Sequence, residues 1–211
     1  MPVLHPESLT DSFRKSRLVL YLIRVEGFKK TPYGTPRHIG VGHLLDQQQT
    51  ENEIQIMSSA NPAELSEDQI YDLLYEDVSD AFEDLALIFS EEDIQKWDNT
   101  RQIVMVSQAF QFGPNRLKKF AKQNKAVKKQ DWETAAAESL DSLAAKQTPS
   151  RWQEQAEMLR LGDAYWTQNT DTPQVPDSDK PVDKDMIKIV QLAYQIKELT
   201  DKLNATLKGG E

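Results

Sequence analysis

The sequence predicts an α+β fold, with short strands in one segment near the N-terminus and helices over most of the remaining chain. Residues 28–46 are rich in turn formers and end in a strand-like alternation. Ser66 opens a stretch whose apolar residues recur at helical spacing. Residues 101–112 are apolar nearly all round, as in a helix at the centre of a core. A chain of 211 residues can bury such a core, and one domain with an appendage is expected.

The N-terminal part of the domain is expected to be a helix followed by short strands. Residues 1–12 read as an extended lead-in, and a helix with a broad apolar face is expected from about Ser12. Glu26 ends the apolar run and Gly27 can terminate the helix. Prolines and glycines then exclude a helix over 28–46, which we interpret as strands and turns.

The rest of the domain is expected to be helical after a polar loop over 47–63. A long amphipathic helix is expected over about 66–88, because Ser66 and Gln69 have the spacing of a capping box. Ser90 has the character of the next cap. Further helices are predicted over 101–112, 115–125, 131–145 and from Thr148 to about Gly162.

The C-terminal part has a different composition. Residues 167–183 are polar and contain three prolines, which predicts an extended linker. A final helix is expected over 184–208, in which Ile189, Ile196 and Leu203 repeat every seven residues. This is too short for a firm coiled-coil prediction, so docking on the same chain and an oligomerisation or docking tail remain open.

The composition excludes several classes of function. The chain has no cysteine, which excludes disulfides, thiolate metal sites and cysteine nucleophiles. No apolar run reaches the roughly 18 to 20 residues that span a bilayer, so membrane insertion is not expected. The first nine residues lack the apolar core of a signal peptide, and synthesis in the cytoplasm is expected.

The net charge of −9 is unevenly distributed. Residues 46–99 carry 16 acidic and one basic residue, whereas residues 101–160 carry 11 basic and six acidic ones. The acidic part is either a solvated helix face or the side turned away from a basic groove that binds a polyanion. Nucleic acid is not the expected partner, because the basic residues lack interleaved aromatics and no nucleic-acid-binding motif is present.

Several segments, taken in order, resemble the phage-type lysozymes, the T-even phage lysozyme family (glycoside hydrolase family 24). The similarity covers about Phe13 to Trp166. It is carried by Ile23-Arg24-Val25-Glu26-Gly27, Tyr33, Ile39-Gly40-Val41-Gly42-His43-Leu44-Leu45, Phe110-Gln111-Phe112-Gly113, Asp131-Trp132-Glu133-Thr134-Ala135-Ala136 and Gln147-Thr148-Pro149-Ser150-Arg151.

The resemblance implies a lysozyme-like domain over 13–166. A small N-terminal lobe with a β-hairpin, about 13–65, would be joined to a helical lobe, about 89–166, by the helix at about 66–88. The implied substrate is bacterial peptidoglycan, cleaved in the cleft between the lobes at the β-1,4 bond after N-acetylmuramic acid. No metal or organic cofactor is implied.

The resemblance assigns the general acid to Glu26, which would protonate the glycosidic oxygen from a partly apolar site. Family members also carry an aspartate and a threonine in this site. The aspartate position falls near Thr35 and the threonine position is His38, so the second carboxylate is missing. No Asp or Glu lies between Glu26 and Asp46.

Three mechanisms remain open at this point. In the first, His38 acts as general base or nucleophile beside Glu26. In the second, Glu26 alone serves as acid and then as base while the muramic acid 6-hydroxyl attacks its own C1, which is lytic transglycosylase chemistry. In the third, the domain is inactive and is a structural or glycan-binding module of a phage particle.

The other matched residues are expected to support the site. Tyr33, Gln111 and Arg151 are candidates for substrate binding, and for Arg151 a structural role at a helix start is equally open. His43 is expected to be structural, and a metal site at His38 and His43 is not expected because no carboxylate lies beside them in the sequence. An enzyme of this kind would act on the cell wall, either free or associated with the virion, where the final helix would dock or self-associate.

Overall fold

The computed structural model describes Arg14, residues 16–45 and residues 64–169. The chain divides into two units, residues 1–20 with 175–211 and residues 21–174. Apart from Arg14 and residues 16–20, every described residue belongs to the second unit. In the described part of the chain, no helix is both long enough and apolar enough to cross a bilayer.

The described residues are mostly helical and include one small antiparallel sheet, which confirms the expected α+β class at this level. The N-terminal elements are α2 (Arg17–Glu26), β1 (Lys29–Tyr33), β2 (His38–Gly40) and β3 (His43–Leu44). The strands lie in the order β1-β2-β3, with Tyr33 opposite His38 and Ile39 opposite His43.

The alternation from His38 to His43 suggested one strand, but the structure has two short strands here. β2 ends at Gly40 and β3 begins at His43. Gly40 and Gly42 have φ values of 64° and 76°, a left-handed conformation that glycine adopts at little cost. The Gly-Val-Gly sequence therefore makes a turn that folds the chain back on itself.

The predicted long helix is α4 (Glu67–Ala86), and its capping box is present. The Ser66 hydroxyl accepts from the Gln69 N–H, and the Gln69 side chain accepts from the Ser66 N–H. α4 packs against β2, β3 and α6. A side chain at Gly40 would come within 3.3 Å of Ile70, so glycine lets the sheet approach the helix closely.

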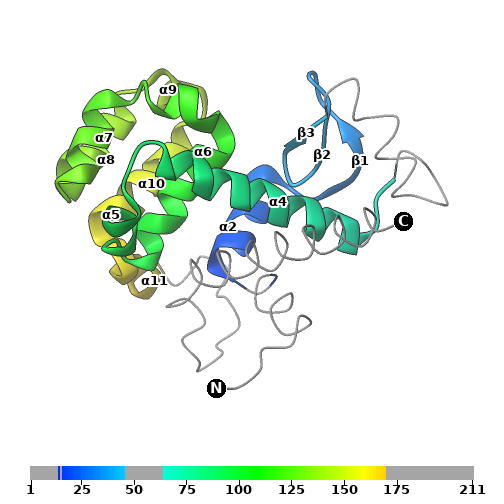
Figure 1. Cartoon of the computed structure of the whole chain (residues 1–211), viewed down its shortest axis with the longest axis horizontal. Coiled ribbons are helices and arrows are strands. Elements are labelled where there is room, and N and C mark those ends of the chain that lie inside the picture. The colour runs from blue at the N-terminus through cyan, green and yellow to red at the C-terminus, as the bar shows by residue number, and fades with distance from the viewer. Residues whose placement is uncertain (1–13, 15, 46–63, 170–211) are drawn as a thin grey trace, which may run out of the picture. The chain divides into compact units, whose positions relative to one another are not determined.

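Figure 1 shows α4 leading from the sheet to a cluster of helices. The cluster consists of α5 (Glu91–Gln95), α6 (Asn99–Leu117), α7 (Ala121–Lys128), α8 (Trp132–Leu140), α9 (Leu143–Gln147), α10 (Pro149–Leu161), the 3-10 turn Gly162–Ala164 and α11 (Tyr165–Gln168). Ser90 caps α5, as expected. Residues 103–109 of α6 are all buried, which confirms its predicted place in the core.

Three predicted boundaries in the helical part are wrong. The segment expected to be helical over 115–125 is interrupted at 118–120 between α6 and α7, and the one over 131–145 is split into α8 and α9. The break inside α6 at Gly113, where φ is 64°, instead agrees with the predicted end of the helix over 101–112. The predicted linker begins too early, because α11 continues to Gln168.

The remaining predictions about the chain fall on residues that the structure does not describe. These are the N-terminal extension over 1–12, the loop over 47–63, the rest of the linker and the final helix over 184–208.

Candidate active site

Five segments of the chain converge on one pocket of about 290 Å³. One side is formed by the end of α2, the end of β1, the start of β2 and the turn before β3, and the opposite side by α6. The lining residues are Glu26, Tyr33, His38, Gly42, Phe110 and Gln111. Four of the residues that the sequence nominated, Glu26, Tyr33, His38 and Gln111, therefore meet in one place.

The end of α2 fixes the position of Glu26. Gly27 follows with φ of 87° and donates its N–H to the Ile23 carbonyl at 2.9 Å, which terminates the helix immediately after the acid. A Cβ atom at Gly42 would lie 3.5 to 3.6 Å from the side chain of Glu26. A larger residue in place of Gly42 would therefore have its side chain in contact with that of Glu26.

Glu26 forms an ion pair with Arg151, in the first turn of α10. Its Oε1 atom lies 2.6 Å from Nη1 of the arginine, in close contact but without the alignment of a hydrogen bond. The side chains are 20% and 12% exposed, respectively. The surroundings of Glu26 are thus more polar than the partly apolar site that the resemblance implied. Arg151 contacts the carboxylate of Glu26 directly.

A buried polar network holds Arg151 in place. Its Nη2 donates to the Ser107 hydroxyl at 3.0 Å. The Gln155 amide donates toward Ser107 at 3.3 Å and toward the Tyr21 hydroxyl at 3.2 Å. Burial raises the pKa of Tyr21 to about 12, with the Gln155 hydrogen bond acting in the opposite direction. The sequence offered no periodic signal for this network, because its members come from α2, α6 and α10.

The ring of His38 is oriented by a hydrogen bond to the backbone. Its Nδ1 lies 2.9 Å from the carbonyl oxygen of Pro36. A carbonyl only accepts, so Nδ1 carries the proton, and in the neutral ring Nε2 carries the lone pair. The imidazole lies beside the Tyr33 ring, with the ring centres 5.8 Å apart. The turn that precedes β2 therefore sets the tautomer needed by a general base.

The negative charge of Glu26 affects the pKa of Tyr33. Burial raises the pKa of its hydroxyl, the negative charge of Glu26 raises it further, and a hydrogen bond from the Gly42 backbone opposes both. On the other side of the pocket, Oε1 of Gln111 is shielded from solvent and has no hydrogen-bond partner among the described residues. Tyr33 and Gln111 are thus polar groups on opposite walls.

Thr35 does not join the site. It lies in the exposed turn between β1 and β2, and it is not among the described residues that line the pocket. The family resemblance implies a carboxylate at this position. In this chain the residue is a threonine, and its side chain does not line the pocket. Thr35 therefore lies outside the candidate site.

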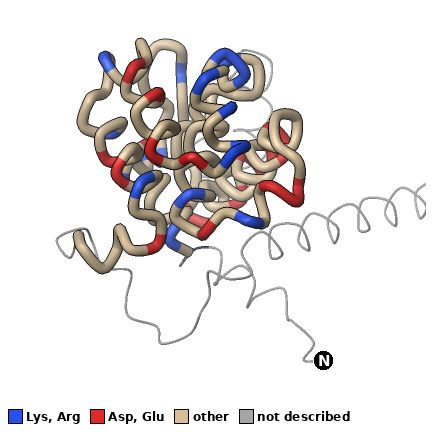
Figure 2. Tube along the Cα trace, turned by 90° about the vertical axis from the view of Figure 1, so that its left-hand side faces the viewer, with Lys and Arg blue, Asp and Glu red and all other residues tan. Residues whose placement is uncertain are grey.

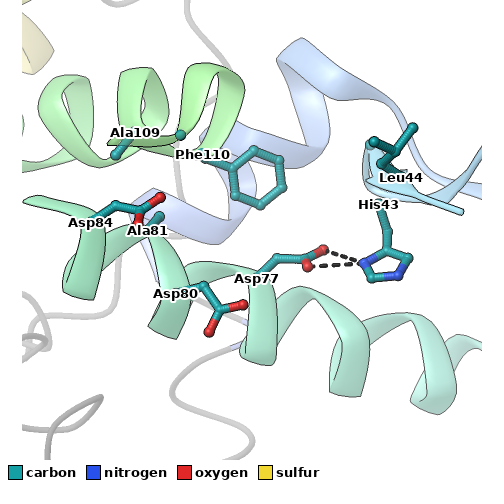
Figure 3. A pocket seen from close by; sticks show the side chains of 10 residues that line it. His43, Leu44, Asp77, Asp80, Ala81, Asp84, Ala109 and Phe110 are labelled. Carbon is teal, nitrogen blue, oxygen red and sulfur yellow. Dashed lines mark hydrogen bonds and ion pairs between the residues drawn. The ribbon is translucent and has the colours of Figure 1, made fainter. Parts of the chain in front are cut away.

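A second pocket, of about 230 Å³, adjoins the first, because Gly42 and Phe110 line both. Figure 3 shows its wall of aspartates on α4, Asp77, Asp80 and Asp84. Burial raises the pKa of Asp84, and the neighbouring Asp80 and Glu83 raise it further, against an opposing effect of Lys118. Sequence analysis did not single out these aspartates, although their spacing of three and four residues places them on one helix face.

His43 lies in this second pocket and ties the sheet to α4. Its Nδ1 lies 2.9 and 3.0 Å from the two carboxylate oxygens of Asp77 (Figure 3). A carboxylate only accepts, so Nδ1 is the donor. Within the described residues, no cluster of three or more His, Asp or Glu side chains is arranged to hold a metal ion.

No model of a known protein family matches this chain, and a comparison with curated protein sequences finds no match either. Function is therefore inferred from the geometry of the site together with the sequence segments compared above.

Proposed function

We propose that the domain is a two-lobed, lysozyme-like muramidase that hydrolyses the β-1,4 bond between N-acetylmuramic acid and N-acetylglucosamine in bacterial peptidoglycan. One observation carries the proposal: Glu26, at the end of α2, shares a single pocket with His38, Tyr33 and Gln111. The sheet and the helical cluster on either side of α4 would be the two lobes. The bond cleaved and the polymer class come from the resemblance of these segments to phage-type lysozymes.

The shape of the site suits a linear polymer. Two adjoining pockets, of about 290 and 230 Å³, share Gly42 and Phe110 in their linings. Ligand pockets for single compact molecules occupy roughly 300 to 1,000 Å³ and enclose most of the ligand. Two adjoining pockets at or below the lower end of this range are matched to successive units of a glycan strand.

The proposed hydrolysis uses Glu26 and His38 in two roles. Glu26 delivers a proton to the glycosidic oxygen as the bond from that oxygen to C1 breaks. Nε2 of His38 takes a proton from a water molecule whose oxygen bonds to C1. The proton on His38 is then returned to Glu26 through solvent, which restores both residues. Arg151 stabilises the carboxylate that Glu26 becomes after its proton has left.

A second candidate is lytic transglycosylation, which one specific observation favours. Glu26 is the sole carboxylate among the described residues that line its pocket. In this reaction Glu26 protonates the leaving oxygen and then accepts the proton of the muramic acid 6-hydroxyl, whose oxygen bonds to C1. The product has a 1,6-anhydro ring, and no water is consumed.

Product analysis decides between the two reactions. Purified peptidoglycan is incubated with the full chain and the soluble fragments are analysed by mass spectrometry. We expect reducing ends, whereas 1,6-anhydro ends would establish transglycosylation. If the wild-type chain releases no fragments of either kind, both enzymatic proposals fail and a structural or glycan-binding module remains.

The His38→Ala variant tests the proposed base. A His-dependent hydrolase should lose about 10²- to 10⁴-fold in rate. The matched control is Arg37→Ala, an exposed neighbour in the same turn that does not line the pocket. Full activity in His38→Ala would remove that residue from the mechanism.

The cellular setting follows from the substrate. An enzyme of this kind would be made in the cytoplasm of a host cell and would act on the wall, either free or as part of a virion. Sizing of the full chain against a chain shortened to residues 1–169 tests whether the C-terminal segment mediates self-association. Equal, monomeric behaviour of the two would discard that idea.

A further inference from the structure

The stretch from the end of α6 through α7 carries a concentration of positive charge. Residues 99–130 contain no Asp or Glu, although the chain as a whole has a net charge of −9. Seven cationic side chains near the end of this stretch are exposed, and we call them the α7 basic face. They are Arg116, Lys118, Lys119, Lys122, Lys125, Lys128 and Lys129. Figure 2 views the molecule from the side on which α7 and α8 lie in Figure 1.

Few of these charges are neutralised. Lys122 lies 3.7 Å from Glu138 and its side chain is still 78% exposed. Lys128 lies over the ring of Phe89, at 5.7 Å from its centre. Among the described residues, no acidic side chain lies within ion-pair distance of Lys125 or Lys129. Most of the positive charge on this face is therefore available to an external anion.

The α7 basic face presents positive charge but, among the described residues, no exposed aromatic or large apolar side chains. Phe120, the aromatic residue at the start of α7, is stacked on Trp152 at 5.7 Å with an interplanar angle of 4°. The apolar residues Leu117, Ala126 and Val127 are buried. Binding of single-stranded nucleic acid usually needs exposed aromatic platforms for the bases, and insertion into lipid needs exposed apolar side chains. The described surface of α7 provides neither of these.

The basic face reaches the edge of the proposed substrate groove. Asp84 lines the second pocket, and the positive charge of Lys118 opposes the rise in the pKa of that carboxyl. That pocket adjoins the Glu26 pocket, because Gly42 and Phe110 line both. A polymer attached to a glycan strand in the groove would therefore meet the first cation of this face at the rim.

We propose that the α7 basic face binds an anionic phosphodiester polymer of the bacterial wall, of the poly(glycerol phosphate) type, that accompanies the glycan strand. The inference rests on the proposed peptidoglycan substrate. Lys122, Lys125 and Lys129 lie three to four residues apart and so on one side of the helix, as a row of point charges that suits a repeating phosphate. Because the net charge of the chain is negative, an anionic polymer is expected to bind at this face and not over the rest of the surface.

The test uses two variants with the same change in net charge. The first is the triple variant Lys122→Gln/Lys125→Gln/Lys129→Gln. The matched control is Lys29→Gln/Lys96→Gln/Lys146→Gln, three exposed lysines of β1, the end of α5 and α9. Binding of purified poly(glycerol phosphate) is measured between 50 and 200 mM salt, together with thermal unfolding to confirm that both variants are folded.

We expect the first variant to lose about tenfold or more in affinity. The slope of log affinity against log salt should become shallower by about 2, at roughly 0.7 per lost phosphate contact, as for single-stranded polyanions. The control should stay within about twofold of the wild type. Equal loss in both variants, or no binding by the wild type, would overturn the proposal.

Two further probes separate the polymer from other polyanions. Single-stranded DNA with the same number of phosphates and vesicles of anionic lipid should each bind at least about tenfold more weakly than poly(glycerol phosphate). Equal or tighter binding of either would assign the face to that partner instead. The Glu26→Gln variant should bind poly(glycerol phosphate) like the wild type, so a failure of catalysis and a failure of this proposal are observed separately.

Discussion

Replacing Arg151 with methionine removes the partner of Glu26 while keeping an unbranched side chain. Removing one partner of a fully buried ion pair costs about 3–5 kcal/mol of stability. A surface ion pair contributes only about 0–1 kcal/mol. The two side chains here are 12% and 20% exposed and 2.6 Å apart, and the arginine also donates to Ser107. We therefore expect Arg151→Met to lower the free energy of unfolding by about 2–3 kcal/mol.

A double-mutant cycle with Glu26→Gln isolates the ion pair from the other contacts of Arg151. Urea unfolding followed by circular dichroism gives the free energy of unfolding of the wild type, both single variants and the double variant. Contacting charged residues typically show coupling of about 0.5–3 kcal/mol, and we expect about 1–2 kcal/mol here. The midpoint of thermal unfolding should fall by about 5–10 °C in Arg151→Met.

The same helix supplies a control. Arg160, near the end of α10, pairs with Glu133 at 3.0 Å, but the glutamate is 77% exposed. Arg160→Met should therefore cost less than about 1 kcal/mol. A coupling energy below about 0.3 kcal/mol between Glu26 and Arg151 would show that the pair does not form in solution, and it would refute the placement of the acid described above.

Three further predictions concern stability. Asp77→Asn should lower the free energy of unfolding by about 1–3 kcal/mol in urea, because the carboxylate accepts from His43, and an unchanged value would contradict this. Trp152→Ala should cost about 3–5 kcal/mol in the same assay, because the indole is fully buried and stacked on Phe120; a cost below about 1 kcal/mol would disagree. Burial raises the pKa of Tyr21 from 10.0 to about 12. Between these pH values the unfolded chain loses this proton and the folded chain keeps it. Wild-type stability should therefore fall relative to Tyr21→Phe by about 2–3 kcal/mol as pH rises from 10 to 12, and parallel pH curves would speak against it.

Helix boundaries set by local chemistry could be predicted from the sequence. Ser66 with Gln69, Ser90 and Gly27 all act within one turn of their own helix, and each does so in the structure. The breaks at 118–120 and 141–142 were missed. The first coincides with the packing of Phe120 on Trp152, a contact between distant segments that no local pattern encodes.

The second missed break did leave a signal. Ser142 caps α9 by accepting from the Ala145 N–H at 3.0 Å, and an Asp-Ser pair before an apolar residue is a recognisable helix start. The alanine-rich composition on both sides favoured one continuous helix and obscured this signal.

The membership of the site was predicted better than its electrostatics. Glu26, Tyr33, His38 and Gln111 were nominated through the family resemblance, and the fold brings them to one pocket. The pairing of Glu26 with Arg151 could not be predicted, because α2 and α10 are far apart in the sequence and neither shows a pattern specific to the other. Only the tertiary structure turns a residue nominated for substrate binding into the ion-pair partner of the acid.

The central claim is that Glu26 is the proton donor in peptidoglycan cleavage, and the Glu26→Gln variant tests it most directly. Glutamine keeps the shape of the side chain and cannot donate a carboxylic acid proton. The rate at which soluble muropeptides are released from purified peptidoglycan is measured for both proteins at a temperature where both are folded. We predict a loss of about 10²- to 10⁴-fold. A rate within tenfold of the wild type would contradict the assignment.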